Sequence, residues 1–246
     1  MYTHDNTRPG VAGSSRDWAR YVWPILVGCS PVSPGCAHCV SAYYVGGEVA
    51  RARRFTGLAE AKGGGFRWTG KVDLDWSSAS TPGRWPVGER IFVAPFSDLF
   101  HPSVPGEFIR RSFYTMARDP EHVYLVLTKR AARASSMLST IPHGPHIYLG
   151  VSIENQDAAE ERLPLFADHL DWMIWANLEP LLGPVDLTPA LDYLDWVAVG
   201  PEFGVGAREC RGEWVEAVYG QARAAGVPIW VKGLLDGMRV EEAPNL

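Results

Sequence analysis

The chain has 246 residues, of which 46% are hydrophobic and 21% charged, and its formal net charge is −5. This composition argues against extensive disorder, and the mild acidity gives no support for strong non-specific binding to nucleic acid, although a local basic patch would still allow such a partner. No run reaches the ~20 apolar residues of a membrane span and residues 1–17 lack an apolar signal core, so we expect a cytoplasmic protein with no membrane association.

Short apolar runs alternate with helix-like segments along the chain. The pattern predicts seven strands, at residues 21–27, 91–94, 122–127, 146–151, 172–176, 196–199 and 228–231. It predicts five helices, at residues 41–54, 105–118, 131–139, 156–167 and 213–225. Pro24 places the first strand at an edge of its sheet. The unbroken apolar run at 123–127 suits a strand buried on both faces, and the strand–helix alternation indicates βαβ units.

About six to seven parallel strands fall short of a complete eight-stranded barrel. The sequence therefore predicts an α/β fold of the partial (β/α) TIM-like barrel type, with a doubly wound open sheet as the alternative. We expect a single domain over residues 1–246. Residues of about 56–90 contain several glycines and tryptophans and are predicted to form a long irregular excursion that acts as a lid.

Three of the four cysteines lie within eleven residues. Cys29, Cys36 and Cys39 have the spacing C-x6-C-x2-C, between the first predicted strand and the first helix. A structural zinc ion takes four ligands, and the fourth would have to be His38 or the distant Cys210. A [4Fe–4S] cluster is normally held by four thiolates, so three would leave one iron open. The spacing favours iron–sulfur over zinc, and unliganded thiols remain a third interpretation.

Polar residues follow the C-terminal ends of the predicted strands from the second strand onward. They are Ser97 and Asp98, Thr128 and Lys129, Ser152 and Glu154, Asn177 and Glu179, Glu202, and Lys232. The C-terminal ends of parallel strands are the face on which α/β barrels build their sites, so we expect a shared polar cavity there. For any one of these residues, solvation of a loop is an equally good explanation.

Two further groups have both functional and structural interpretations. His101 is a candidate ligand or proton donor, although a histidine directly before a proline more often makes a structural hydrogen bond, and Cys210 is interpreted as a bystander. A basic and aromatic group resembles a phosphate-contacting surface, but a solvated helix end is slightly favoured. This group comprises Arg51, Arg53, Arg54, Phe55, Phe66, Arg67 and Trp68.

The cysteine loop and the blocks that follow it resemble the three-Cys-motif phage proteins, an uncharacterised family that is similar to radical S-adenosylmethionine (SAM) enzymes. The resemblance covers most of the chain and begins with residues 23–29 and 32–39. Further blocks follow in the same order, at residues 68–72, 91–93, 97–101, 127–130, 150–156, 179–184, 199–202, 206–208 and 225–228, ending at Lys232.

The resemblance implies a partial barrel of the radical SAM type, in which Cys29, Cys36 and Cys39 hold a [4Fe–4S] cluster and SAM lies across the strand ends. The implied cofactor-binding residues are Ser97 and Asp98 at the SAM amino group, Ser152 and Glu154 at the ribose, Lys129 at a carboxylate, and Thr128. The candidate catalytic residues are Glu179 and Glu202, which would face the substrate, and Lys232, which would meet an anionic group.

By the same resemblance, the reduced cluster cleaves SAM, and the resulting radical abstracts hydrogen from the substrate. A phage or mobile-element context suggests a small molecule, a nucleotide or a modified nucleobase as substrate, and flavodoxin or ferredoxin as electron donor. The competing hypothesis is a non-catalytic zinc-binding module that presents a nucleic-acid or protein-binding surface. An enzyme that uses the cluster without SAM is a third possibility.

Overall fold

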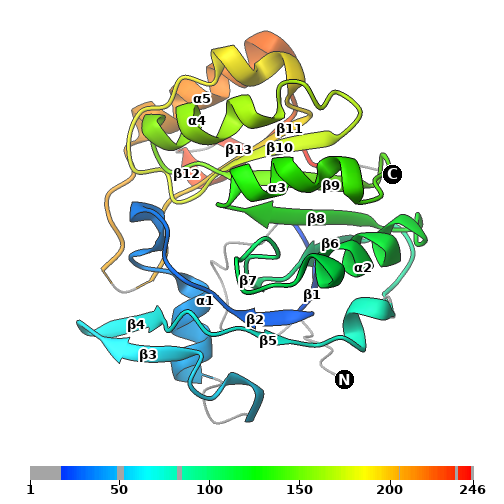
Figure 1. The fold of residues 1–246 in the computed structure, drawn as a ribbon. Helices are drawn as coiled ribbons and strands as arrows, with labels where there is room; N and C mark the ends of the chain where they lie inside the picture. Colours follow the sequence, from blue (N-terminus) through cyan, green and yellow to red (C-terminus); the bar gives the residue numbers. More distant parts are fainter. Residues whose placement is uncertain (1–17, 49–52, 82–84, 205, 236–237, 245–246) are drawn as a thin grey trace.

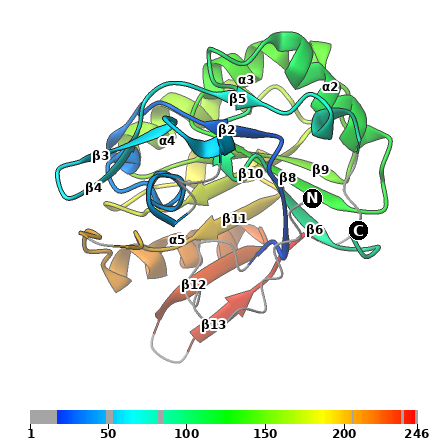
Figure 2. The ribbon, with the colours of Figure 1, turned by 90° about the horizontal axis from the view of Figure 1, so that it is seen from below.

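The computed structural model describes residues 18–48, 53–81, 85–204, 206–235 and 238–244. Its main feature is an eight-stranded sheet that curls into a half-barrel (Figures 1 and 2). In spatial order the strands are β1 (Tyr21–Trp23), β6 (Arg90–Val93), β8 (Val123–Thr128), β9 (Ile147–Ser152), β10 (Met173–Leu178), β11 (Trp196–Val199), β12 (Ile229–Leu235) and β13 (Met238–Glu241). The first seven pair in parallel, and β13 pairs antiparallel with β12.

Helices follow most of these strands, as the alternating sequence pattern predicts. They are α1 (Val40–Tyr43), α2 (Gly106–Ala117), α3 (Ala131–Met137), α4 (Gln156–Arg162) and α5 (Gly212–Ala225). Shorter helical turns are η1 (Pro34–Cys36), η2 (Tyr44–Glu48), η3 (Arg53–Phe55), η4 (Ser78–Ser80), η5 (Leu138–Thr140), η6 (Leu163–Phe166) and η7 (Thr188–Tyr193). The chain therefore has a mixed α/β fold with a mostly parallel, curled sheet, consistent with a partial β/α barrel.

The two faces of the sheet carry different cores because side chains alternate along each strand. On β9 and β10, Leu149 and Ile174 face outward and join the large core under the helices. Tyr148 and Trp175 face inward and join a second core inside the half-barrel. Because both faces of the sheet are buried, successive residues along these strands are apolar.

Indole rings fill the inner core. Trp175 stacks on Trp196 with ring centroids 4.6 Å apart, and Trp18 meets Trp175 edge-on at 5.2 Å. Gly150 provides the space, because a Cβ atom there would lie 2.3 Å from the Trp175 ring. These rings form much of the core on the inner face of the half-barrel.

The first predicted strand, residues 21–27, is interrupted. Pro24 has no N–H for a sheet, and the chain leaves β1 there to form β2 (Leu26–Gly28). β2 lies in a separate three-stranded sheet between β5 (Asp73–Leu74) and β7 (Phe96–Ser97). This change of sheet places the cysteine loop, which follows β2, at the end of the half-barrel.

The helix predicted at 41–54 is only partly α-helical. α1 ends at Tyr43 and the chain continues as the wider turn η2 to Glu48, residues 49–52 lie outside the described part of the chain, and the short turn η3 begins at Arg53. Gly46 and Gly47 are poor helix formers. A Cβ atom at Gly46 would lie 2.2 Å from the ring of Phe66, so the glycine is needed for close packing.

The excursion predicted to be irregular contains a β-hairpin. β3 (Ala59–Lys62) and β4 (Gly65–Trp68) pair antiparallel, and the hairpin projects beside α1 (Figure 1). Its turn is Gly63-Gly64, where both residues have positive φ, as a tight two-residue hairpin turn requires. The sequence analysis also missed β13, which follows the strand predicted to be the last.

Candidate functional site

A cavity opens at the C-terminal ends of the parallel strands and holds about 1050 Å³ of space, including its open mouth. Of the residues predicted for the site, those that line it are Cys29, Cys36, Cys39, Ser97, Asp98, Thr128, Lys129, Ser152, Asn177, Glu179 and Glu202. Glu154 and Lys232 do not line it, but each is ion-paired with a residue that does. The strand-end residues are thus gathered around one cavity, while their individual roles stay predictions.

The cysteine loop begins where β2 ends and forms one wall of the cavity. Gly28, with φ +98, makes the turn into the loop, and a Cβ atom there would lie 2.1 Å from the carbonyl oxygen of Lys71. Cys29 follows directly, Cys36 ends the turn η1, and Cys39 immediately precedes α1. Burial, reinforced by the nearby charge of Asp98, raises the pKa of the Cys29 thiol to about 12.

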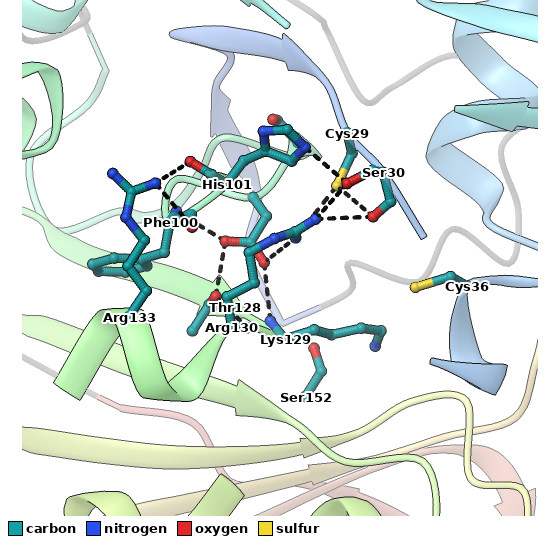
Figure 3. Close-up of polar contacts among 12 residues, drawn as sticks. Cys29, Ser30, Cys36, Phe100, His101, Thr128, Lys129, Arg130, Arg133 and Ser152 are labelled. Atoms are coloured by element: carbon teal, nitrogen blue, oxygen red, sulfur yellow. Dashed lines mark hydrogen bonds and ion pairs between the residues drawn. The ribbon is translucent and has the colours of Figure 1, made fainter. Parts of the chain in front are cut away.

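The three thiols share one wall without forming a ready-made metal site. Figure 3 shows Cys29 and Cys36 apart from each other. In the described ranges, no three side chains of His, Cys, Asp or Glu lie close enough together to hold a metal ion. The chemistry of the donor set nevertheless fits iron–sulfur or zinc, since three soft sulfur donors face one cavity. Cys210 does not line the cavity and packs against the outer core.

A buried carboxylate, Asp98, and the guanidinium of Arg130 lie beside the start of the cysteine loop. Asp98 Oδ1 accepts hydrogen bonds from the Phe100 N–H (2.9 Å) and the Thr128 hydroxyl (2.8 Å). Asp98 Oδ2 accepts from the Lys129 N–H (3.0 Å) and from Arg130 Nη1 (2.9 Å). Figure 3 shows this group of contacts. Asp98 therefore joins the segment after β7 to the turn after β8.

His101 makes structural hydrogen bonds in the same region. Its Nδ1 accepts from the Ser103 N–H at 3.1 Å, and its Nε2 lies 2.9 Å from the Ser30 hydroxyl. Burial and the charge of Arg130 lower the pKa of His101. The neutral ring with its proton on Nε2 can donate to Ser30, which supports the structural interpretation.

Glu154 lies beneath the middle of the cysteine loop and is almost completely buried. Arg162 donates to both of its oxygens, at 2.9 and 3.3 Å, and a Cβ atom at Gly35 would come within 3.2 Å of its carboxylate group. Burial alone would raise the pKa of Glu154, but the charge of Lys129 and hydrogen bonds from Arg162 and Ser33 outweigh it and lower the pKa.

Glu202 connects the strand end of β11 with the cysteine loop through Arg208. Arg208 donates its N–H (3.0 Å) and its Nε (2.8 Å) to Glu202, and its Nη2 donates to the Pro34 carbonyl at 3.0 Å. Burial alone would raise the pKa of Glu202, but the hydrogen bonds and charge of Arg208 lower it. The carboxylate is therefore ionised at neutral pH.

Glu179, which lines the cavity, forms a buried ion pair with Lys232. The Lys232 ammonium also lies 5.4 Å from the centre of the Trp18 ring, within the range of a cation–π contact. Both predicted catalytic groups are therefore held in place by the inner core.

Asn177 is a buried polar residue with unused hydrogen-bonding capacity. It is 3% exposed, lines the cavity, and lies beside Ser152 in the register of β9 and β10. Its Oδ1 has no hydrogen-bond partner among the described residues. A buried amide oxygen of this kind is suited to accept a hydrogen bond from a bound ligand.

The residues that the sequence analysis missed are mainly arginines. Arg130, Arg162 and Arg208 each neutralise one predicted carboxylate. The acidic residues at the buried strand ends were the sequence signal for these arginines, because a buried carboxylate needs a cationic partner. The spacing of the motifs did not show which cations would supply it.

Arginines of the predicted basic and aromatic surface form ion pairs with nearby acidic residues. Arg54 pairs with Asp73 and Asp75, and Arg67 pairs with Glu60. Arg51 lies outside the described residues. These pairs support the interpretation of a solvated, structural group.

The fold and the site together define a partial β/α-barrel protein with a cysteine-lined cavity at its strand ends. Residues 13–239 match a family described as "Protein of unknown function (DUF5131)", and the chain belongs to that family. No curated protein matches the sequence. The predicted phage context stays a prediction, because the matched description names none.

A solved structure of a spore photoproduct lyase complexed with dinucleoside spore photoproduct is similar in fold. The TM-score is 0.52 and the identity 13%, over 90% of this chain and 78% of that chain. At this identity the likeness shows the fold alone. No helix among the described residues is long and apolar enough to cross a membrane.

Proposed function

We propose that the protein is a radical SAM enzyme whose cluster is held by Cys29, Cys36 and Cys39. One observation carries the proposal: three cysteines and the polar residues that follow five strands line a single cavity, on a half-barrel whose fold is similar to that of spore photoproduct lyase, a radical SAM enzyme. Three thiolates complete all but one position of a [4Fe–4S] cluster, which leaves an iron for SAM. Binding the cluster would draw together sulfurs that otherwise lie apart.

The [4Fe–4S] cluster would supply chemistry that no side chain of the protein can supply. Held by Cys29, Cys36 and Cys39, a reduced cluster would supply the electron for reductive cleavage of SAM and so the means to remove a hydrogen atom from the substrate. The contribution of the protein is to bind, orient and exclude water.

The polar residues of the cavity divide into positioning groups and groups that face a ligand. The oxygens of Asp98 already accept four hydrogen bonds, so Asp98 would organise the site around the SAM amino group while Ser97 presents its hydroxyl oxygen. Lys129 would meet the SAM carboxylate. Ser152 and Asn177, which are neighbours across two strands, would bind the ribose hydroxyls.

The predicted catalytic residues would hold the substrate as charged groups. Glu202 is kept ionised by Arg208, which suits binding better than proton donation at neutral pH. Glu179 and Lys232 would present an ion pair to a polar substrate group.

The similar spore photoproduct lyase structure contains a dinucleoside, and a nucleotide or other small molecule is the substrate class we propose here. An acidic electron-transfer protein such as flavodoxin or ferredoxin would supply the electron.

Metal analysis of protein purified and reconstituted without oxygen tests the proposal against the zinc module. We expect about four irons and four sulfides per chain and a brown colour from sulfur-to-iron charge transfer. Colourless protein that retains one zinc and takes up no iron would reject the proposal in favour of the zinc-binding module.

A further inference from the structure

Arg130 lies at the point where the chain leaves β8 and begins α3, and its side chain reaches across to the start of the cysteine loop. Its Nη1 donates to Asp98 Oδ2 at 2.9 Å and lies 3.6 Å from the sulfur of Cys29. Its Nη2 donates to the carbonyl oxygen (2.9 Å) and the hydroxyl (3.0 Å) of Ser30. One guanidinium thus contacts the first cysteine, its neighbour and a buried carboxylate (Figure 3).

The position of Arg130 is fixed without help from the rest of the loop. Its own N–H donates to the Thr128 hydroxyl at 2.9 Å, and Thr128 in turn donates to Asp98. The side chains of Arg130 and Asp98 are 9% and 7% exposed. These contacts hold the arginine beside the sulfur of Cys29 through residues that lie outside the cysteine loop.

The contact distinguishes Cys29 from the other two cysteines. Cys36 lies 3.9 Å from the Ser33 hydroxyl, a neutral group. Within the described part of the chain, neither Cys36 nor Cys39 has a hydrogen bond from a cationic side chain. Positive charge is thus placed asymmetrically, at the cysteine that follows β2.

We infer that Arg130 sets the reduction potential of the cluster through the sulfur of Cys29, an inference that rests on the proposed function. Reduction adds one negative charge, and an N–H donor and a full positive charge next to a ligand sulfur stabilise the more negative state. The partial burial of the site strengthens this effect, because the surrounding dielectric is lower than in water. Arg130 is accordingly a positioning and tuning residue, and it makes the cluster easier to reduce.

The test is a redox titration of reconstituted protein with dithionite and mediator dyes, followed by electron paramagnetic resonance. The variants are Arg130→Gln, which removes the charge, and Arg130→Lys, which keeps a charge but loses the planar fork. Arg208→Gln is the matched control, because Arg208 also anchors the loop, at Pro34, without contacting a sulfur.

At the midpoint potential of the unaltered protein, we expect Arg130→Gln to lower the ratio of reduced to oxidised cluster about tenfold, which is ~59 mV for one electron. Arg130→Lys should fall between, and Arg208→Gln should stay within about twofold of the unaltered protein. An unchanged midpoint in Arg130→Gln would overturn the inference, and so would an equal shift in Arg208→Gln, which would indicate a general effect of loosening the loop.

Because Arg130→Gln leaves the Asp98 charge uncovered, the double variant Asp98→Asn/Arg130→Gln removes both charges together, and its potential should lie between those of Arg130→Gln and the unaltered protein. If both variants fold, as judged by circular dichroism, but retain no cluster, Arg130 holds the loop and the tuning role is rejected. Unaltered protein that binds no cluster would instead reject the proposed function itself. The two failures are therefore distinguishable.

Discussion

The side chain of Arg208 joins the buried carboxylate of Glu202 to the carbonyl oxygen of Pro34 in the cysteine loop. Each strand-end acid of the cavity has a comparable cationic partner. The pairs are Asp98–Arg130, Glu154–Arg162, Glu179–Lys232 and Glu202–Arg208. Two of them, through Arg130 and Arg208, also contact the cysteine loop, so the loop is tied to the half-barrel at both its start and its middle.

Replacing Arg208 with glutamine should destabilise the protein in a pH-dependent way. Removal of the partner leaves a carboxylate that is 3% exposed, but Arg208 itself is 34% exposed, so we expect a loss of only about 1–2 kcal/mol at pH 7. The lowered pKa of Glu202 means that its contribution is present above the ordinary value of 4.5 and is lost as the pH falls through the folded-state pKa. Urea unfolding at pH 7 and pH 4 measures both effects.

The exposed Arg118 provides the control, because Arg118→Gln should change the free energy of unfolding by less than about 0.5 kcal/mol. Equal stability of Arg208→Gln and the unaltered protein at pH 7 would contradict the account. A loss that persists undiminished at pH 4 would show that the ion pair is not its cause.

Each loop cysteine should be required for iron binding. Cys29→Ala, Cys36→Ala and Cys39→Ala should each lose most of the reconstituted iron and the visible absorption, because two thiolates do not hold the cluster. Cys210→Ala should retain both, since Cys210 packs against the outer core away from the cavity. Iron and sulfide analysis measures the result, and a Cys210→Ala variant that loses iron would show that a fourth cysteine takes part.

Substitution of Gly150 should disturb the inner aromatic core. A Cβ atom at this position would lie 2.3 Å from the Trp175 ring, so Gly150→Ala should cost about 1–3 kcal/mol of unfolding free energy. At Gly183 a Cβ atom meets nothing within 4 Å, and Gly183→Ala should be neutral or slightly stabilising. Thermal or urea unfolding compares the two variants, and similar stabilities would be inconsistent with the packing described.

The repeating units of the fold were predictable because their signals are local. The buried strands β8, β9 and β10 are mainly apolar, and α5 is followed by Gly226, which adopts the left-handed conformation common after helices. The predicted convergence of strand-end residues also followed from parallel topology alone.

The errors lie where distant residues decide the local structure. The wider turn η2 stands where an α-helix was predicted, and its Gly46 packs closely against Phe66 of the hairpin. The partners of the strand-end acids were missed for the same reason, since Arg208 is placed at Pro34 only by the closing of the half-barrel. Sequence spacing contains no information about such contacts.

Asn177 should contribute to SAM binding without affecting the cluster. Its unpartnered amide oxygen lies in the cavity beside Ser152, so Asn177→Leu should weaken SAM binding about tenfold, or ~1.4 kcal/mol. Equilibrium dialysis of the reconstituted protein with labelled SAM measures the affinity, and iron content serves as the control for cluster loading. An unchanged affinity would place SAM elsewhere in the cavity.

The most direct test of the central claim is the formation of 5′-deoxyadenosine by the reconstituted protein after reduction with dithionite in the presence of SAM, measured by liquid chromatography and mass spectrometry. We predict that the unaltered protein forms 5′-deoxyadenosine and methionine in equal amounts and that Cys36→Ala forms neither. Unaltered protein that carries a reducible cluster, yet produces no more 5′-deoxyadenosine than Cys36→Ala, would contradict the assignment as a radical SAM enzyme.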